Sequence, residues 1–275
     1  MQHIDYNSIA EIYDLYVTAD YDVPFFLSEI KPVSGPVLEL MAGTGRLSLP
    51  LLEAGVKLTC VDSSSAMLEV LSRKLQQRGL HAEVVCADVC QLSLPAAFEL
   101  AILPFQAFME IIGVENQRAA LAAVFKCLAP GGRFICTLHN PAIRRKQVDG
   151  LLRLVGQFPT EGGTQTAMEK RSAAILSADK MSALPSGTLV VSGFEQGGNP
   201  VVSRQQFFEF FDGEGRLLEK RLLQMKFAFI EKDAFEQMAQ SAGLRVAQLY
   251  GNYDRAPFDP VQSPVMIWRL EKNNL

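Results

Sequence analysis

The sequence predicts an α/β fold in which a mostly parallel sheet carries helices on both faces. Three observations predict it. Apolar segments alternate with helical segments through the first half of the 275-residue chain, a glycine-rich turn follows the first apolar segment, and strand-like segments joined by tight turns fill much of the second half. Apolar strands that alternate with helices are typical of parallel sheets buried on both sides.

Five strands are expected in the first half, because each is a short apolar run of the length that strands have. They cover residues 36–41, 57–62, 82–88, 98–105 and 133–139. Residues 63–79 begin with serines, end with a glycine and place apolar side chains on one face, which predicts a capped amphipathic helix. Helices are also predicted over 46–55 and 116–132.

The second half of the chain has a different sequence pattern. Residues 148–186 show no regular pattern, whereas three segments that follow look like antiparallel strands, because short glycine-containing turns join them. These strands cover 188–196, 201–212 and 216–230, and a helix over 231–244 and strands over 245–251 and 265–271 come after them. We therefore divide the chain into a first part of the core (1–147), an inserted antiparallel sheet (148–230) and a C-terminal part that completes the core (231–275).

Composition argues against two classes of partner. The formal net charge is -4, so the chain lacks the overall positive field that tight nucleic-acid binding needs, and no nucleic-acid partner is expected. The one dense basic stretch, residues 142–147, is interpreted as a solvated helix face. No apolar run approaches the length of about 20 residues that spans a membrane, so no membrane association is expected.

The N-terminus shows neither a basic start nor an apolar stretch of signal-peptide length. The five cysteines are odd in number and stand mostly in apolar contexts, which is typical of buried, reduced thiols. We therefore expect a cytoplasmic protein. Cys86 and Cys90 are too isolated from other ligand-type residues to indicate a metal site, and no metal is expected.

The stretch "VLELMAGTGRLSLPLLEAG" (37–55) is a strand, a glycine turn and a helix, the pattern of a turn that lies under a nucleotide. Gly43 and Gly45 allow the backbone to approach a ligand, although Ser48 replaces the third glycine of the dinucleotide pattern. Asp62, at the end of the next strand, suits ribose hydroxyls. These features leave two cofactors open, a nicotinamide dinucleotide and S-adenosylmethionine.

Three further features separate the two. Glu39 lies inside the first strand, Asp88 ends the third strand, and a Pro-Gly-Gly turn precedes the fifth. Together, "LELMAGTG", "CVDSSSAML", "CADV" and "LAPGG" resemble the class I S-adenosylmethionine-dependent methyltransferases over about residues 6–140. The resemblance implies a Rossmann-like seven-stranded sheet whose last strand is antiparallel, with an N-terminal helical lid and the inserted antiparallel sheet on the substrate side.

The resemblance also implies roles for single residues. Asp62 would accept from the ribose hydroxyls, and Asp88 would read the adenine amino group. Met41 stands where the family usually has glycine, and we expect its side chain to turn into the core or toward the lid. The full set of cofactor-binding residues expected from the resemblance is Tyr13, Glu39, Met41, Ala42, Gly43, Gly45, Arg46, Asp62, Ser63, Met67, Asp88, Val89, Leu103 and Phe105.

Catalysis by methyl transfer depends largely on positioning, because the thioether that leaves from the sulfonium is already an excellent leaving group. His139 follows the fifth strand, at the edge where ligands of open α/β sheets bind, and is the candidate general base. Candidate substrate-binding residues are Tyr16, Gln106, Glu110 and Asn140, and the inserted sheet would cover the substrate with one pair of the phenylalanines at 207, 208, 210 and 211.

The function expected from the sequence is methyl transfer from S-adenosylmethionine to a small-molecule acceptor, more readily an amine than a hydroxyl. Two alternatives stay open. One is an NAD(P)-dependent Rossmann oxidoreductase, and the other is a non-catalytic protein that binds S-adenosylmethionine. A homodimer through the inserted sheet is the candidate assembly.

Overall fold

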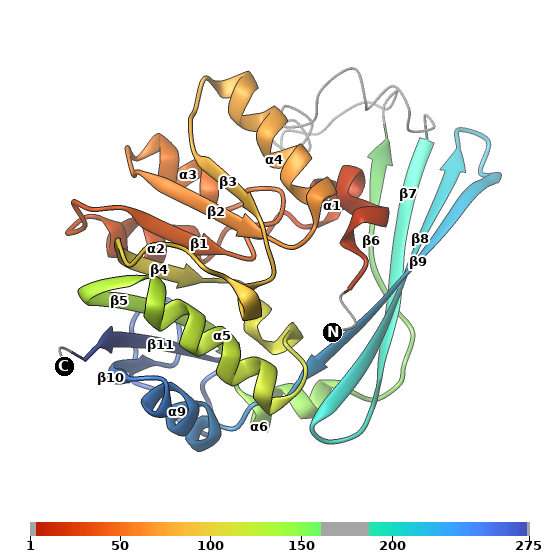
Figure 1. Cartoon of the computed structure of the whole chain (residues 1–275). Coiled ribbons are helices and arrows are strands. Elements are labelled where there is room, and N and C mark those ends of the chain that lie inside the picture. The colour runs from red at the N-terminus through yellow and green to blue at the C-terminus, as the bar shows by residue number, and fades with distance from the viewer. Residues whose placement is uncertain (1–3, 161–186, 274–275) are drawn as a thin grey trace.

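The computed structural model describes residues 4–160 and 187–273 (Figure 1). The irregular segment 148–186, part of the predicted insertion, therefore lies in part outside the described residues. No helix in the described ranges is long and apolar enough to cross a membrane.

A seven-stranded sheet forms the centre, in the order β10-β11-β5-β4-β1-β2-β3. The strands from β3 to β5 run parallel, whereas β11 is antiparallel to both β5 and β10. This confirms the predicted, mostly parallel sheet with an antiparallel last strand. The strands are β1 (Val37–Leu40), β2 (Leu58–Asp62), β3 (Glu83–Cys86), β4 (Phe98–Leu103), β5 (Leu128–His139), β10 (Leu244–Tyr250) and β11 (Val265–Lys272).

Side chains alternate between the two faces of the sheet along each strand. Because apolar side chains point to both faces, helices cover both. In β1, Leu38 and Leu40 belong to the core cluster beneath α5 and α9, whereas Val37 belongs to the cluster beneath α2, α3 and α4. The alternation places Glu39 on the side of α3. The main helices are α2 (Val23–Ile30), α3 (Ser48–Glu53), α4 (Ser65–Arg78), α5 (Val114–Cys127) and α9 (Lys232–Ser241).

The predicted caps of α4 are present. The hydroxyl of Ser64 accepts from the Met67 backbone N–H at 3.2 Å, and Gly79 ends the helix with a φ of 64°. The fifth strand begins earlier than predicted, at Leu128, because the backbone before Arg133 already pairs with β4 and shifts its register there. The Pro-Gly-Gly turn thus belongs to the strand.

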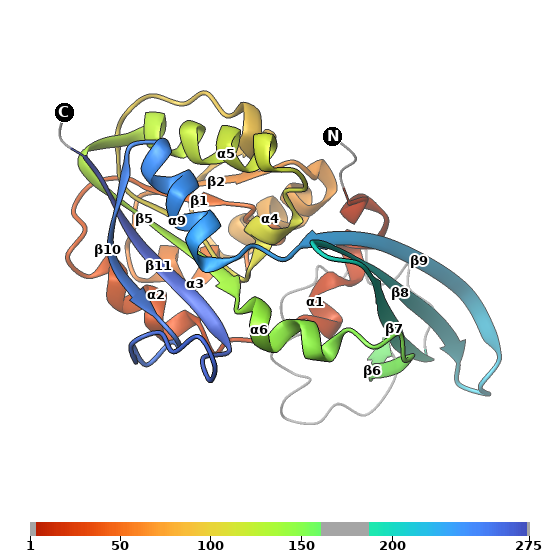
Figure 2. The same cartoon turned by 90° about the horizontal axis from the view of Figure 1, so that it is seen from below.

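A second sheet of four antiparallel strands stands beside the core, as Figures 1 and 2 show. Three of its strands were predicted and one was missed, because β6 is largely exposed and lacks a clear alternation of apolar and polar residues. The strands are β6 (Arg153–Thr160), β7 (Gly187–Gly197), β8 (Val201–Asp212) and β9 (Leu217–Ala228).

The N-terminal lid consists of a 3-10 helix η1 (Tyr6–Ile12) followed by α1 (Tyr13–Tyr16). Its apolar side packs between α4 and the inner face of the second sheet, where it forms one cluster with Met67, Phe208 and Phe210. The lid therefore joins the two sheets. The other short elements are η2 (Val89–Gln91), η3 (Ala107–Glu110), α6 (Pro141–Arg144) and η4 (Arg145–Gln147).

The five cysteines are all free. Cys60, Cys127 and Cys136 are buried, as expected, but Cys86 is exposed because it ends the edge strand β3. The expectation of buried thiols is therefore wrong for Cys86, and Cys90 is only partly buried.

Candidate active site

The glycine turn after β1 is held by β2. The Gly43 N–H donates to Oδ2 of Asp62 at 2.8 Å, and the Ala42 N–H donates to the Val61 carbonyl at 3.0 Å. Gly43 has a φ of 57°, and the space beside its Cα is open to 4 Å. Gly45 has a φ of 87°, which favours glycine, and a Cβ there would lie 2.3 Å from a methyl carbon of Leu71 in α4, so that side chain would have to shift. The turn thus presents bare backbone at Gly43.

Met41 adopts a φ of 56°, the left-handed region that favours glycine. Its side chain packs against the core cluster and also lines a hollow above the turn. The methionine therefore occupies a glycine-type backbone conformation, in the manner expected of a residue that turns into the core.

This inner hollow lies over the ends of β1, β2 and β3, between the turn at Met41–Gly43, Asp62, Asp88 and the lid. Residues from the predicted cofactor set that line it are Tyr13, Met41, Gly43, Asp62, Ser63, Met67, Asp88, Val89 and Phe105.

Two carboxylates at the inner hollow have fixed orientations. Oδ1 of Asp62 accepts from the Ser64 N–H at 2.8 Å, while burial raises the pKa of Asp62 above its usual value. Asp88 precedes η2 and accepts from the Cys90 N–H at 2.8 Å. Both side chains therefore stand at strand ends with their oxygens held by backbone donors.

The other predicted cofactor residues do not line the inner hollow. Glu39 is 1% exposed and accepts from the Ser48 hydroxyl at 2.6 Å, and Leu103 is fully buried in β4. Arg46 forms a two-pronged ion pair with Asp22 at 2.6 and 2.7 Å. Ala42 and Gly45 form the turn itself.

A buried charge pair fixes the lid above this turn. Asp14 pairs with Lys74 of α4 and accepts from the Thr44 hydroxyl at 2.7 Å, and the Lys74 ammonium donates to the Thr44 carbonyl at 2.8 Å. Burial lowers the pKa of Lys74, since charge is costly in the interior. The neighbouring Tyr13 is thereby held over the inner hollow.

An outer hollow of about 510 Å³ continues from the inner one beneath the second sheet. Four side chains line both hollows and mark their junction: Tyr6, Tyr13, Phe105 and Glu110. Three other predicted residues, Tyr16, Gln106 and His139, line the outer hollow alone.

Glu110 is the carboxylate at the junction. Its Oε1 accepts from the Tyr6 hydroxyl at 2.9 Å, and no ion pair joins it to a basic side chain within residues 4–160 and 187–273. Burial raises the pKa of Glu110 to about 7, with the bond from Tyr6 opposing part of that rise. The group can therefore hold or release a proton near neutral pH.

His139 ends β5 at the wall of the outer hollow. Burial, followed by the nearby Arg144 cation, lowers the pKa of His139 to about 4. The imidazole is therefore neutral at pH 7 and holds a proton weakly. Asn140, the next residue, does not line either hollow. Its amide donates to the carbonyls of Pro260 and Ser263 at 3.0 and 2.8 Å.

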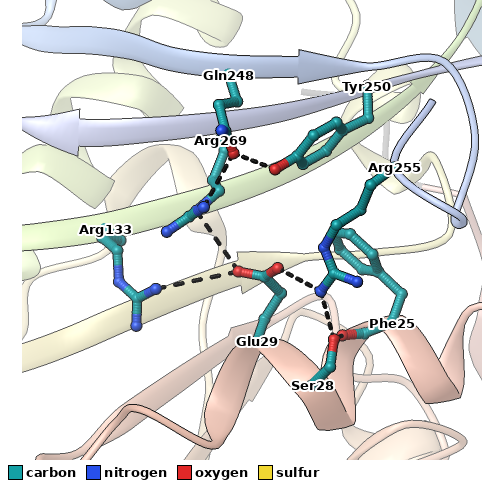
Figure 3. A network of polar contacts seen from close by, with 8 residues as sticks. All are labelled: Phe25, Ser28, Glu29, Arg133, Gln248, Tyr250, Arg255 and Arg269. Carbon is teal, nitrogen blue, oxygen red and sulfur yellow. Dashed lines mark hydrogen bonds and ion pairs between the residues drawn. The ribbon is translucent and has the colours of Figure 1, made fainter. Parts of the chain in front are cut away.

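Gln106 reaches the C-terminal loop. Its Nε2 donates to the Tyr253 hydroxyl at 3.1 Å, and its backbone N–H donates to the Thr137 hydroxyl at 3.0 Å. That loop is anchored by Glu29 of α2, which is 5% exposed and surrounded by the guanidinium groups of Arg133, Arg255 and Arg269 (Figure 3). The network fixes the loop that carries Tyr253 to the outside of the core.

Sequence reasoning missed several residues of the outer hollow. Tyr6 belongs to the N-terminal lid but was assigned no role, and the second sheet contributes Glu195, Arg204, Gln206, Met225 and Phe227. One pair of the phenylalanines at 207, 208, 210 and 211 was expected to cover the substrate, but none of the four lines this hollow. Phe208 and Phe210 are instead buried against the lid, and Tyr16 contacts Phe208 with ring centroids 5.2 Å apart.

The arrangement fits a nucleoside cofactor with a polar tail. The bare backbone at Gly43 allows close approach, Asp62 and Asp88 supply acceptors at two points, and Met67 supplies an apolar border. Residues 37–132 match a methyltransferase domain. The chain has the fold of the class I S-adenosylmethionine-dependent methyltransferases. The match favours S-adenosylmethionine over the nicotinamide dinucleotide that the glycines left open.

Particular proteins resemble the chain to different extents. The cypemycin N-terminal methyltransferase of Streptomyces sp is 30% identical over 118 residues, which cover 42% of this chain and 47% of that protein. The chain thus spans about half the length of this curated relative.

Solved structures match almost the whole chain. An S-adenosylmethionine-dependent methyltransferase from Clostridium acetobutylicum ATCC 824 has a TM-score of 0.75 at 17% identity, covering 98% of this chain and 99% of that one. The sugar N-methyltransferase KedS8 from Streptoalloteichus sp ATCC 53650 has a TM-score of 0.69 at 16% identity, covering 96% and 94%. At these identities the likeness shows the fold alone.

Proposed function

We propose that this protein transfers a methyl group from S-adenosylmethionine to an amine of a small molecule. One observation carries the proposal. The inner hollow, whose lining residues suit the cofactor, meets the outer hollow at Glu110, a half-buried carboxyl whose pKa is raised to about 7. A proton acceptor with a pKa near neutrality at such a junction suits an acceptor that must lose a proton.

The cofactor would lie in the inner hollow. Asp62 would accept from its ribose hydroxyls, Asp88 from its adenine amino group, and Tyr13 would stand over its methionine end. When bound, S-adenosylmethionine supplies an electrophilic methyl group on a sulfonium. The residues at the junction, Tyr6, Phe105 and Glu110, exclude water and orient the acceptor nitrogen for in-line attack.

The proton balance assigns a task to Glu110. An alkylammonium, with a pKa of about 10, has no lone pair and must be deprotonated before it attacks. In the proposed reaction the new C–N bond forms as the C–S bond breaks, and Glu110 takes the nitrogen's proton before passing it to solvent. The products are the methylated amine and S-adenosylhomocysteine.

The preference for an amine over a hydroxyl rests on the same carboxyl. An alcohol is far too weak an acid for a carboxylate with a pKa near 7, whereas an ammonium is within reach of proton transfer. One of the proteins compared above is named a sugar N-methyltransferase and another an N-terminal methyltransferase, which supports the proposal. His139 is a second candidate base, although its low affinity for a proton makes it the weaker one.

The alternative of a non-catalytic binding protein requires a sealed or absent acceptor cavity. The outer hollow of about 510 Å³ is instead in the range of small-molecule sites and adjoins the inner one. The test is calorimetry with S-adenosylmethionine, S-adenosylhomocysteine and NADH, followed by S-adenosylhomocysteine release with matched amines and alcohols. Tight NADH binding with no response to S-adenosylhomocysteine would overturn the proposal, as would turnover of alcohols alone.

We further propose a homodimer through the inserted sheet and a cytoplasmic location. Exposed large apolar side chains gather near the two edge strands of that sheet, including Leu154 at 61%, Leu217 at 52% and Leu222 at 46% exposure, and five free cysteines are usual in a reducing compartment. Sedimentation equilibrium tests the dimer: Leu222→Asp should shift it toward the monomer mass, and a wild-type monomer at high concentration would contradict it.

A further inference from the structure

The inner face of the inserted sheet is apolar except where it covers the outer hollow. Along β8, Phe208 and Phe210 are buried against the lid, whereas Arg204 and Gln206 continue the same face at alternate positions and line the hollow. The register pairs Arg204 with Glu195 of β7. These polar residues interrupt a face that packing alone would keep apolar.

Gln206 carries an unpaired donor. Its side chain is 2% exposed, and its Nε2 has no hydrogen-bond partner among the residues that the structure describes. Burying an amide N–H group without an acceptor is unfavourable, so such groups are rare. A ligand in the outer hollow that offers an oxygen to Gln206 would remove this cost.

The positive charge of Arg204 is only partly neutralised by its ion pair. Its ion pair with Glu195 is 3.8 Å long, and that carboxylate already binds Arg144 at 2.5 Å. Lys226 is exposed on the opposite face of β9, because its partner across the strands is Ser203, so the two guanidinium groups of Arg144 and Arg204 share the single carboxylate Glu195. The part of the outer hollow around Arg144, Arg204 and Glu195 therefore carries a net positive charge, whereas Glu110 stands at the junction with the inner hollow.

The positive region continues outward. Arg144, Glu195 and Arg204 also line a neighbouring recess whose other basic residues are Lys146 and Arg153. The basic stretch 142–147, interpreted from the sequence as a solvated face, thus places Arg144 at the wall of the outer hollow.

We propose that the acceptor amine also carries an oxyanion, a carboxylate or a phosphate, which Arg204 and Gln206 bind. This inference rests on the proposed function and deepens it. The amine lies at Glu110 beside the inner hollow, and the oxyanion lies beneath the inserted sheet. A guanidinium and an amide N–H together match the several acceptor sites of an oxyanion, and the charge makes these hydrogen bonds strong.

Because the acceptor is unidentified, the probe is S-adenosylmethionine labelled in its methyl group, incubated with the whole protein and a small-molecule fraction of a bacterial extract. The labelled product is applied to an anion exchanger above the pKa of its amine. Retention is expected, and labelled product that passes through would overturn the inference. Phosphatase treatment of the fraction abolishes labelling if the oxyanion is a phosphate, and esterification abolishes it if the oxyanion is a carboxylate.

Failure of the proposed function gives a different result. If no product is labelled although the cofactor binds, both the proposed function and this inference are wrong. If alcohols are labelled instead of amines, the amine proposal fails while retention on the anion exchanger still reports the oxyanion.

Two variants locate the oxyanion site. Arg204→Gln and Gln206→Leu should each raise the acceptor KM by about tenfold or more, with the dissociation constant of S-adenosylmethionine unchanged. Gln205→Leu makes the same change on the opposite face of β8 and should leave the KM unaltered. Gln206→Leu should also raise the melting temperature of the ligand-free protein, since it removes the unpaired donor. A lower melting temperature with an unchanged KM would show that Gln206 is structural.

Discussion

The hydroxyl of Tyr6 donates a 2.9 Å hydrogen bond to Oε1 of Glu110, joining the lid to η3 across 104 residues of sequence. The bond lies at the junction of the inner and outer hollows. It opposes the effect of burial, which raises the pKa of Glu110 to about 7. The lid therefore helps to set the acidity of the carboxyl to which we assign proton transfer.

Removing that bond should make Glu110 a weaker acid. Tyr6→Phe is expected to move the pH dependence of kcat to higher pH by about one unit, because the ionised carboxylate loses a donor. Tyr21→Phe changes an exposed tyrosine of the outer hollow and should leave the profile in place. If both variants have the same pH profile as the wild type, Tyr6 does not influence the acidity of the catalytic carboxyl.

Asp62 should control cofactor affinity. Asp62→Ala removes the proposed acceptor for the ribose and releases the Gly43 N–H, so the dissociation constant of S-adenosylmethionine should rise by about 10- to 100-fold. Calorimetry measures it. Glu83→Ala, which removes a carboxylate bonded to Thr59 on the neighbouring strand, is the control and should bind normally. Equal affinities in the two variants would place the ribose elsewhere.

Glu39 makes stability depend on pH. Burial raises its pKa from 4.5 in the unfolded chain to about 7 in the fold. The folded protein therefore holds a proton that the unfolded chain loses, and the free energy of unfolding falls as pH rises through that window, by up to about 1.4 kcal/mol per pH unit.

Glu39→Gln keeps an acceptor for the Ser48 hydroxyl but does not titrate. Its free energy of unfolding relative to the wild type should therefore increase between about pH 5 and about pH 8. Urea denaturation at the two pH values measures the difference. A difference that is constant with pH would mean that Glu39 keeps its ordinary acidity in the fold.

Met41 offers a test of backbone strain. At a φ of 56°, glycine should be more stable than alanine by about 1 kcal/mol, the reverse of their usual order. Thermal unfolding of Met41→Gly and Met41→Ala compares them with the side chain absent from both. The cofactor should bind Met41→Gly within about threefold of the wild type, and far tighter binding would show that Met41 obstructs the inner hollow.

Local sequence signals predicted the core well. The strands around Asp62 and Asp88, and the caps of α4 at Ser64 and Gly79, follow from patterns within a few residues, and the structure has them there. Strand β6 was missed because an exposed strand shows little apolar alternation. The same approach identified Glu110 only as a substrate contact, since nothing local indicates that it is half-buried.

Contacts between distant segments could not be predicted in this way. Tyr6 meets Glu110 only because the lid packs between α4 and the inserted sheet, and Gln206 reaches the outer hollow only through the register of β8 against β7 and β9. For Arg46, the local sequence predicted a contact that a distant residue prevents. Its position after the turn suggests a ligand contact, but its guanidinium forms an ion pair with Asp22.

The central claim is that Glu110 removes the proton from an amine acceptor, and the pH dependence of methyl transfer by Glu110→Gln tests it most directly. Near neutral pH, kcat should fall by about 10²- to 10⁴-fold, with the cofactor bound normally. The loss should shrink at alkaline pH, where the amine is already neutral and needs no base. Wild-type turnover by Glu110→Gln at pH 7, or a loss that stays the same at every pH, would contradict this claim.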